Sequence, residues 1–506
     1  MKKSKYLILG LILCLYFTGC KDWLDVNHNP NQLEEVSGPD VLMPAAQVGI
    51  ANNLMGWDFG FGGGFWVEYW TQSYTASQFK TLCEYLPNGF GTAYNSLMSE
   101  PLMDLKRIKD MTADWDNKGY YFVAEALSIF TWQIITDVWG DMPYFEALRG
   151  EEGIFHPKQD KGDVIYADLM KRIDDLLKLD VSNYSINGDQ DFIYNGDLSK
   201  WYIFANTLKL KLMIRLSEAG NYDNAAVLAH IEKGNMLTES ASIPGSTWDA
   251  SQAGKRHPMQ AFQQGGANYI TTNVRACKTF IDYLNENSDP RLSRLFSGGN
   301  YRGAFFGDFD SKVKSDGATP DNEVTYAGIV FDANPDLPLM SAWEVNFYIA
   351  EVYARAGNHA KAKEFYDAGV RASLNQHGIS NDAIIDPIIG GYAVWQNGTI
   401  EEEIKQISMQ RWVAHCNYQH IESFLERNRT KYPPVHDIDI KANRVKAYEN
   451  FPVGYLTISV NGRQLLREQL PAAPTYPETY ISRNSNSPAQ KPDVGQKVWW
   501  NKKAGK

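Results

Sequence analysis

The sequence predicts a mostly α-helical protein, with helical hairpins packed into a solenoid half and a second, irregular half that is rich in loops. Apolar residues recur at helical spacing over about 40–238 and again over 341–426. By contrast, residues 239–340 are rich in Gly, Ser and Asn and carry isolated aromatic side chains, and residues 375–399 form a second predicted loop region. Because stacked hairpins absorb a long chain in one unit, we expect both halves to form one compact body.

The clearest hairpin pattern runs from Trp343 to Leu374. Its positions at helical spacing are Phe347, Ala350, Ala354, Ala362, Tyr366 and Gly369. The pair Gly357-Asn358 supplies the break between two helices, and the small residues Ala350 and Ala362 allow those helices to approach closely. This order resembles a degenerate tetratricopeptide (TPR) repeat, with Asn346 where the repeat has Trp. One hairpin cannot bury its apolar face alone, so we expect stacked neighbours.

The N-terminus has the features of a secretory signal peptide over residues 1–19. Lysines precede an apolar run from Tyr6 to Phe17, which would rise only about 18 Å as a helix, too little for a bilayer of roughly 30 Å. The run ends in Thr18-Gly19-Cys20, which resembles a bacterial lipobox. That resemblance implies acylation of Cys20, an anchor in outer-membrane lipid, and a lipidated tether over 20–39. An ordinary signal peptide with a chance cysteine is the alternative.

The composition indicates a folded body with no affinity for nucleic acid. Hydrophobic residues make up 44% of the chain, and the net charge of −11 would repel phosphates. Of the five cysteines, Cys14 and Cys20 belong to the N-terminal segment. The other three, Cys83, Cys277 and Cys416, have no metal-like spacing, so we expect buried thiols with at most one disulfide.

The remaining elements follow from the same patterns. Helices are predicted over Asp40–Asn53, Thr92–Met111, Lys118–Thr136, Asp163–Leu179, Leu198–Ser217, a segment from Asp223, Arg275–Asn287 and Ile400–Glu426. A Gly-rich turn near residues 60–64 precedes aromatic residues at i, i+4 spacing, typical of a core-facing helix. The tail over 432–506 is predicted to be loop-like, with Trp499 and Trp500 against the body.

The sequence lacks three common catalytic and cofactor motifs. The sequence has no Gly-x-Ser-x-Gly elbow, no Gly-Lys-Ser/Thr phosphate loop and no His-Glu-x-x-His metal motif. His415 and His420 are too far apart around one predicted helix to share a metal ion. We therefore expect no enzyme, cofactor or metal. A glycan hydrolase stays a minor alternative, because only the separation of two carboxylates in space decides it.

Aromatic residues in the predicted loops are the candidate ligand-binding residues. Sugars present flat C–H faces that Trp and Tyr rings cover well. The candidates are Trp248, Tyr269, Tyr301 and Trp395, joined by Trp57 or Trp66 from the early Gly-rich turn. The competing interpretation is that these rings form local cores that hold their own loops in place.

A set of motifs in order along the chain resembles the SusD/RagB family. The motifs are Cys20-Lys-Asp, Asp137-Val-Trp-Gly-Asp-Met-Pro-Tyr144, Trp201 to Leu216, Asp289-Pro-Arg-Leu292, Glu344 to Leu374, Gln410-Arg-Trp412 with Glu426-Arg427, and Tyr476-Pro-Glu478. The resemblance implies a single SusD-like domain over residues 40–506 and an outer-membrane lipoprotein, lipid-anchored and facing the cell exterior. Lys21-Asp22 resembles a shortened surface-export signal of such lipoproteins.

The same resemblance implies a ligand and a partner. The ligand would be an oligosaccharide, and the partner a SusC-like TonB-dependent transporter that this protein covers as a lid. An oligopeptide is the alternative ligand, recognised by backbone pairing and shape rather than by ring stacking. A TPR scaffold that binds only protein is a third interpretation, which the anchor and the aromatic loops disfavour.

Overall fold

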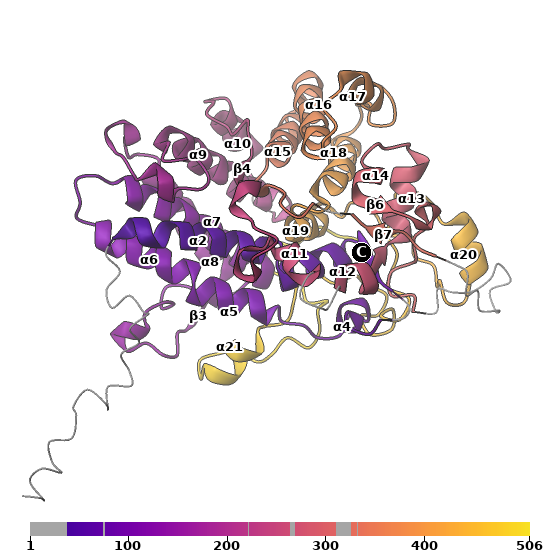
Figure 1. Cartoon of the computed structure of the whole chain (residues 1–506), viewed down its shortest axis with the longest axis horizontal. Coiled ribbons are helices and arrows are strands. Elements are labelled where there is room, and N and C mark those ends of the chain that lie inside the picture. Colours follow the sequence, from indigo (N-terminus) through magenta and orange to yellow (C-terminus); the bar gives the residue numbers. More distant parts are fainter. Residues whose placement is uncertain (1–37, 74–75, 221, 264–268, 310–324, 331) are drawn as a thin grey trace, which may run out of the picture.

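The computed structural model describes residues 38–73, 76–220, 222–263, 269–309, 325–330 and 332–506. The signal peptide, Cys20 and most of the tether lie outside these residues. Helices dominate the described chain and its strands are short, which confirms the predicted fold class (Figure 1). Helices from the two halves of the sequence lie in one body, with α15 to α18 beside the helices of the first half.

The first half of the chain forms a layer of packed helices. They are α2 (Pro39–Leu54), the π-helix η2 (Trp57–Gly62), α3 (Gly63–Trp66), α4 (Lys80–Cys83), α5 (Gly91–Ser99), α6 (Pro101–Thr112), α7 (Gly119–Trp139), α8 (Gly162–Leu176), α9 (Leu198–Arg215) and α10 (Asn224–Ile231). The predicted single helix over Thr92–Met111 is wrong. Pro101 disfavours helical geometry at Glu100, whose φ is −114° and ψ −89°, so the chain bends there and starts α6.

The predicted hairpin is confirmed as α15 (Ala342–Arg355) and α16 (His359–Gln376). Ser341 and Glu344 form a capping box that starts α15, with the Ser341 hydroxyl accepting from the Glu344 amide at 3.1 Å. Gly357 adopts φ +72° at the turn, a conformation that glycine reaches without strain. Gly369 lies so close to Phe347 that an added Cβ would come within 2.7 Å of its ring, so the two helices pack tightly.

The region after the hairpin differs from prediction at two places. The predicted loop over 375–399 contains a helix, α17 (Asp382–Ile389). The predicted single helix over Ile400–Glu426 is in fact two, α18 (Ile400–His415) and α19 (His420–Thr430). Cys416 is extended and Asn417 has φ +69°, so the chain turns a corner between them. His415 and His420 therefore belong to different helices.

The rest of the described chain forms short helices, two-stranded ladders and 3₁₀ turns. The helices are α11 (Pro258–Gln263), α12 (Tyr269–Asn273), α13 (Lys278–Glu286), α14 (Leu292–Leu295), α20 (Arg444–Asn450) and α21 (Glu478–Arg483). The antiparallel pairs are β1 (Trp70–Gln72) with β5 (Val274–Ala276), β2 (Met142–Pro143) with β3 (Gln159–Asp160), β4 (Ala241–Ile243) with β8 (Leu337–Met340), and β6 (Phe296–Ser297) with β7 (Gly328–Ile329). The 3₁₀ turns are η3 (Gly150–Glu152), η4 (Val181–Asn183), η5 (Gly188–Gln190), η6 (Leu216–Glu218), η7 (Gly245–Thr247), η8 (Ala253–Lys255) and η9 (Gly299–Tyr301). Arg275, the predicted start of a helix, lies in β5 instead.

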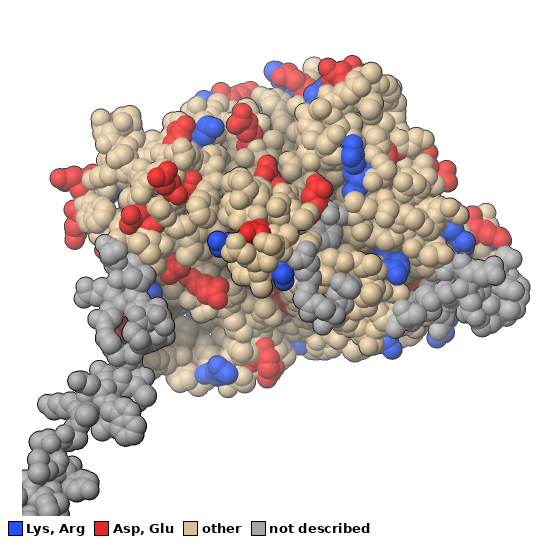
Figure 2. Space-filling view, in the orientation of Figure 1, with Lys and Arg blue, Asp and Glu red and all other residues tan. Residues whose placement is uncertain are grey.

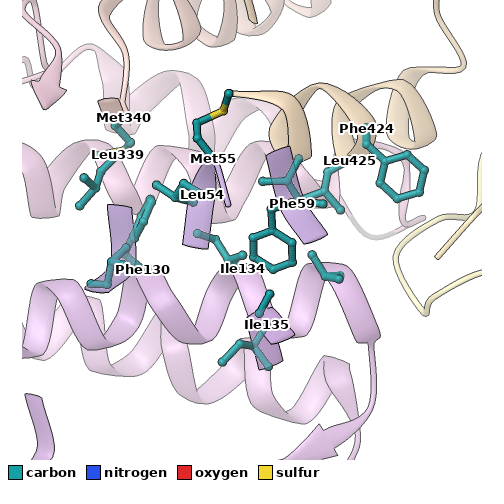
Figure 3. Packing of buried hydrophobic residues seen from close by; sticks show 14 of the residues in the cluster. Leu54, Met55, Phe59, Phe130, Ile134, Ile135, Leu339, Met340, Phe424 and Leu425 are labelled. Atoms are coloured by element: carbon teal, nitrogen blue, oxygen red, sulfur yellow. The ribbon is translucent and has the colours of Figure 1, made fainter. Parts of the chain in front are cut away.

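A continuous apolar core joins the two halves. Leu54 and Phe59 from α2 and η2 pack near Phe130 of α7, Met340 of β8 and Phe424 of α19 (Figure 3). These five positions run from residue 54 to residue 424, so the core links elements from distant parts of the chain. A second cluster lies under the hairpin, around Trp343, Phe347, Tyr366 and Trp395. The expectation of one compact body is confirmed.

A network of buried charges lies beside this core. It comprises Asp137, Lys211, Arg215, Glu344, Glu351, Arg411, Glu422, Glu426 and Arg429. Arg429 contacts Glu351 and Glu426, both at 2.6 Å, and its side chain is fully buried. Burial alone would raise the pKa of Glu351, but Arg429 and its neighbours lower it to about 2.

The remaining predictions concern the cysteines and the tail. Cys83, Cys277 and Cys416 are buried free thiols. Trp500 is buried, and its indole Nε1 donates to the Asp137 carbonyl at 3.1 Å, so the end of the tail packs against the body as expected.

Candidate ligand-binding cleft

A cleft of ≈ 710 Å³ lies between α2, the chain around and after η5, and the segment 244–256. Its size falls within the range of small-molecule sites, about 300–1,000 Å³. Apolar lining comes from Val48, Phe192, Pro244 and Trp248. Polar lining comes from Asn52, Asp189, Asp191, Asn195, Ser246, Thr247, Lys255 and Arg256.

Asp191 holds one wall of the cleft in place. The side chain is only 2% exposed and accepts from Gln47 Nε2 at 2.8 Å, Trp201 Nε1 at 2.7 Å and the Gly196 amide at 3.0 Å. Gln47 belongs to α2 and Trp201 to α9, so one carboxylate ties the loop after η5 to two helices. A fully satisfied buried network of this kind rigidifies its surroundings.

The opposite wall is the segment 244–256, which hydrogen bonds hold in place. The Gly245 amide donates to Asp336 Oδ1 at 2.6 Å, and the Asp249 amide donates to the Lys255 carbonyl at 2.8 Å. Trp248 sits within this segment with 5% of its surface exposed, and its ring meets the His257 ring edge-on at 5.4 Å. Burial lowers the pKa of His257 to about 3, so this imidazole is neutral at pH 7.

Several polar groups of the cleft remain available to a ligand. Asn52, Asp189 and Asn195 are exposed, and their side chains make no hydrogen bond to the described residues. Lys255 is likewise exposed at the rim. Two amides, a carboxylate and an ammonium beside apolar surface match the hydroxyls and C–H faces of a sugar.

The carboxyl groups of the cleft can be compared with those of a glycoside hydrolase. Glycoside hydrolysis normally uses two carboxyl groups flanking the scissile bond. Two aspartates line the cleft, but Asp191 is committed to the wall, which leaves Asp189 as the free carboxylate among the described lining residues. No group of three or more His, Cys, Asp or Glu side chains suited to a metal ion occurs in the part of the chain that the structure describes.

Of the sequence-predicted aromatic residues, Trp248 lines the cleft and Trp57 and Trp66 do not. Trp57 is half-buried and packs on Phe79 at 5.5 Å, among other rings. Trp66 is 2% exposed, stacked on Phe90 at 4.9 Å. Both rings belong to the aromatic packing around η2 and α3.

Trp395 and Tyr301 also lie outside the lining of the cleft. Trp395 is 6% exposed, packs on Tyr366 at 5.2 Å, and donates from Nε1 to Asn397 Oδ1 at 2.9 Å. Tyr301 is half-buried in η9. Tyr269 is the first residue of α12, and its side chain lies outside the described structure. The structure does not gather the described aromatics in one place.

Sequence reasoning missed the polar wall of the cleft. Asn52 lies near the end of α2, and Asp189 and Asn195 lie in the turn-rich stretch 187–197, which was not singled out from the sequence. Its run of Asn, Asp and Gly was the available signal, since such a stretch marks an exposed loop that carries free polar groups.

Comparison with known proteins agrees with this architecture. A family described as starch-binding and associating with the outer membrane matches residues 30–452. The chain belongs to the SusD-like family. No match was found among curated proteins.

Solved structures support the SusD-like fold over nearly the whole chain. A chitin-binding protein aligns with a TM-score of 0.70 and 21% identity, covering 92% of this chain and 100% of its own. A SusD homologue from Bacteroides uniformis aligns at 0.71 and 20%, covering 91% and 99%. A chitin-binding SusD homologue from Flavobacterium johnsoniae aligns at 0.69 and 18%, covering 92% and 99%.

Charged side chains of both signs occur on the visible face of the molecule (Figure 2). Acidic and basic side chains are scattered over the visible face and do not gather into a basic patch among the coloured residues (Figure 2). Within the described chain, no helix has the length and hydrophobicity to span a bilayer.

Proposed function

We propose that this SusD-like protein captures an oligosaccharide in the cleft beside Trp248 and delivers it to a SusC-like TonB-dependent outer-membrane transporter. The observation that carries the proposal is the composition of the cleft. An aromatic residue and apolar side chains lie beside the unpaired side chains of Asn52, Asp189 and Asn195, with both walls braced by hydrogen bonds.

Braced walls favour binding of a polar ligand. Removing the hydroxyls of a sugar from water costs free energy unless the site offers hydrogen bonds that replace those to water. Free amide and carboxylate groups offer those bonds, and a wall that is already ordered loses little further conformational entropy. The aromatic side chain contributes contact with a C–H face of the sugar.

Isothermal titration calorimetry of cleft variants tests the proposal. Chitin and starch oligosaccharides are the first ligands to try, since two similar structures are named chitin-binding and the family is described as starch-binding. We expect Asn195→Ala and Trp248→Ala each to weaken binding roughly fivefold to tenfold, corresponding to about 1 kcal/mol per lost contact. Trp115→Ala, at an exposed tryptophan outside the cleft, is the matched control.

Melting temperatures separate binding from folding. Asn195 is exposed, so its truncation should leave the melting temperature unchanged. Because Trp248 is buried, Trp248→Ala should lower the melting temperature in either case. Unchanged affinity in both Asn195→Ala and Trp248→Ala would make Trp248 purely structural and place the ligand elsewhere. A peptide library titrated in parallel tests the oligopeptide alternative, and tight peptide binding without glycan binding would replace the proposed ligand class.

The anchor and the transporter complete the proposed function. Acylated Cys20 would hold the protein in the outer membrane facing the exterior, and anchoring beside the transporter raises the effective concentration of the two proteins. Affinity purification from outer membranes in mild detergent should recover a large barrel protein together with this chain. Cys20→Ala should release the chain from membranes and lose that partner. Recovery of the wild-type chain alone would contradict the partnership.

A further inference from the structure

A second pocket, of ≈ 440 Å³, lies between α13, α16, the loop 392–398 and α18. It shares none of its lining residues with the Trp248 cleft. Three tyrosines, Tyr283, Tyr366 and Tyr392, supply rings from three different segments, and Val394 and Met409 add apolar surface. Tyr366 belongs to the core cluster under the hairpin and Tyr392 packs against that cluster, so the pocket opens onto an aromatic edge of this core.

Two of the tyrosine hydroxyls have no partner in the protein. Tyr366 is only 2% exposed, yet its hydroxyl makes no hydrogen bond to any described residue, and neither does that of Tyr283. Burial raises the pKa of both phenols, so each stays protonated and can donate and accept. Neither hydroxyl oxygen is among the buried unpaired polar atoms of the described chain, so both reach the open pocket, where a ligand hydroxyl can replace water.

The third tyrosine is held rigidly and orients the wall. The Tyr392 hydroxyl donates to Asp289 and accepts from Arg291 Nη2 at 3.0 Å. Its ring meets Tyr283 edge-on, with centroids 6.3 Å apart. Trp395, behind the pocket, packs on Tyr366 at 5.2 Å and so supports that ring from the core side. The aromatic wall is therefore ordered before any ligand arrives.

The rim is also preorganised. The Gln396 amide donates to Gln406 Oε1 at 2.8 Å, and Gln406 Nε2 donates back to the Gln396 carbonyl at 2.7 Å, which fixes the loop on α18. Thr399 and Glu402 form the capping box that starts α18. Lys405, which is exposed at the rim, makes no ion pair with the described residues. An ordered rim lowers the entropic cost of binding.

From these observations we infer that the tyrosine pocket, walled by Tyr283, Tyr366 and Tyr392, is a second saccharide site that accepts one sugar unit. The inference rests on the proposed function, in which the chain binds saccharides. A purely apolar ligand would leave both free hydroxyls unpaired, whereas a pyranose offers hydroxyls to Tyr283 and Tyr366 and a C–H face to the rings. Two saccharide sites on one anchored chain would increase its avidity for a polymeric glycan.

Variants that remove only a hydroxyl test the pocket in the full chain. Tyr366→Phe and Tyr283→Phe keep the rings, and neither breaks a hydrogen bond within the described protein. We expect each to weaken binding of the methyl glycosides of glucose and N-acetylglucosamine roughly fivefold, at an unchanged melting temperature. Tyr353→Phe, on α15 outside both sites, is the matched control and should bind as the wild type does. Val394→Trp, which fills the pocket, should abolish binding there.

The outcomes separate this inference from the proposed function. Monosaccharide binding that survives Trp248→Ala but not Val394→Trp supports an independent second site. Equal affinity in the wild type and both Tyr→Phe variants overturns it, as does loss of all monosaccharide binding in Trp248→Ala. A third outcome is that the tyrosine pocket binds monosaccharides while Asn195→Ala and Trp248→Ala leave the affinity for oligosaccharides unchanged. That outcome would contradict the proposed Trp248 cleft and leave the tyrosine pocket supported.

Discussion

At the scale of single residues, the buried ion pairs place the strictest demands on the chain. Arg429 is fully buried and makes paired contacts with Glu351, through Nη1 and Nη2 at 2.6 Å each, and with Glu426. Taking such groups out of water is expensive, and only close pairing compensates for it. Burial would raise the pKa of Glu426, yet Arg411 and Arg429 lower it to about 2, so the carboxylate stays charged.

The substitution Arg429→Leu should therefore be strongly destabilising. It leaves two buried carboxylates short of a cation, and we expect the free energy of unfolding to fall by about 3–5 kcal/mol. Urea denaturation followed by circular dichroism measures the loss. Arg371→Leu is the control: Arg371 pairs with Asp382 and Asp386 at the surface, where such pairs contribute about 1 kcal/mol or less. Similar losses in both variants would contradict the importance of burial.

At the scale of elements, the hairpin of α15 and α16 depends on small residues at its contact. Ala350 and Ala362 are fully buried, and Gly369 faces the ring of Phe347. Side chains at such positions set the distance between two helices, since interiors are close-packed. The small residues of the TPR-like sequence pattern therefore mark the positions at which the two helices approach closely.

Gly369→Ala should destabilise the protein even though alanine favours helices. The new Cβ would lie 2.7 Å from Phe347, a buried ring with little room to move. We expect overpacking to cost about 1–3 kcal/mol, partly offset by the better helix propensity of alanine, about 1 kcal/mol. Thermal unfolding measures the net change. Gly91→Ala, at the start of α5 with nothing within 4 Å of its added Cβ, should be neutral or slightly stabilising, and an equal loss there would refute the argument.

At the scale of the whole molecule, burial of histidines couples stability to pH. Burial lowers the pKa of His257 and His415 to about 3, and of His377 and His420 to about 4. At His420, Nδ1 donates to the Gly60 carbonyl at 2.6 Å and Nε2 accepts from the Asn417 amide at 2.8 Å, so a second proton would break a hydrogen bond. These four side chains lie in or directly beside α11, α16, α18 and α19, so their protonation affects several parts of the structure.

The protein should lose stability as the pH falls below about 6.5. Unfolded histidines bind protons near that value, whereas the folded ones do so only at about 3 or 4, so the unfolded state binds more protons in between. Glu68, whose pKa burial raises to about 8, opposes this trend, but by a single proton. Calorimetry from pH 7.5 to 4.5 at constant ionic strength should show a falling melting temperature. A constant or rising value would contradict the burial of these imidazoles.

The sequence by itself determined the fold class, most helices, the TPR-like hairpin and the resemblance to the SusD-like family. These depend on periodicity and short motifs, which are local properties of the chain, as at Ala350, Ala362 and Gly369. The sequence-based prediction of continuous helices was wrong at two places. Pro101 bends the chain at Glu100, and a turn at Cys416–Gln419 interrupts an apolar pattern that continues on both sides.

Only the tertiary structure decided which aromatic residues reach a cavity. Trp66, Trp395 and Trp248 have the same sequence character and are all buried in core clusters, yet Trp248 also lines the cleft. The cleft itself is formed by α2, the chain after η5 and the segment 244–256, which are far apart in sequence. The pairing of β1 with β5 likewise joins Trp70 to Ala276. Exposure depends on which distant segments pack together, and no local pattern records that choice.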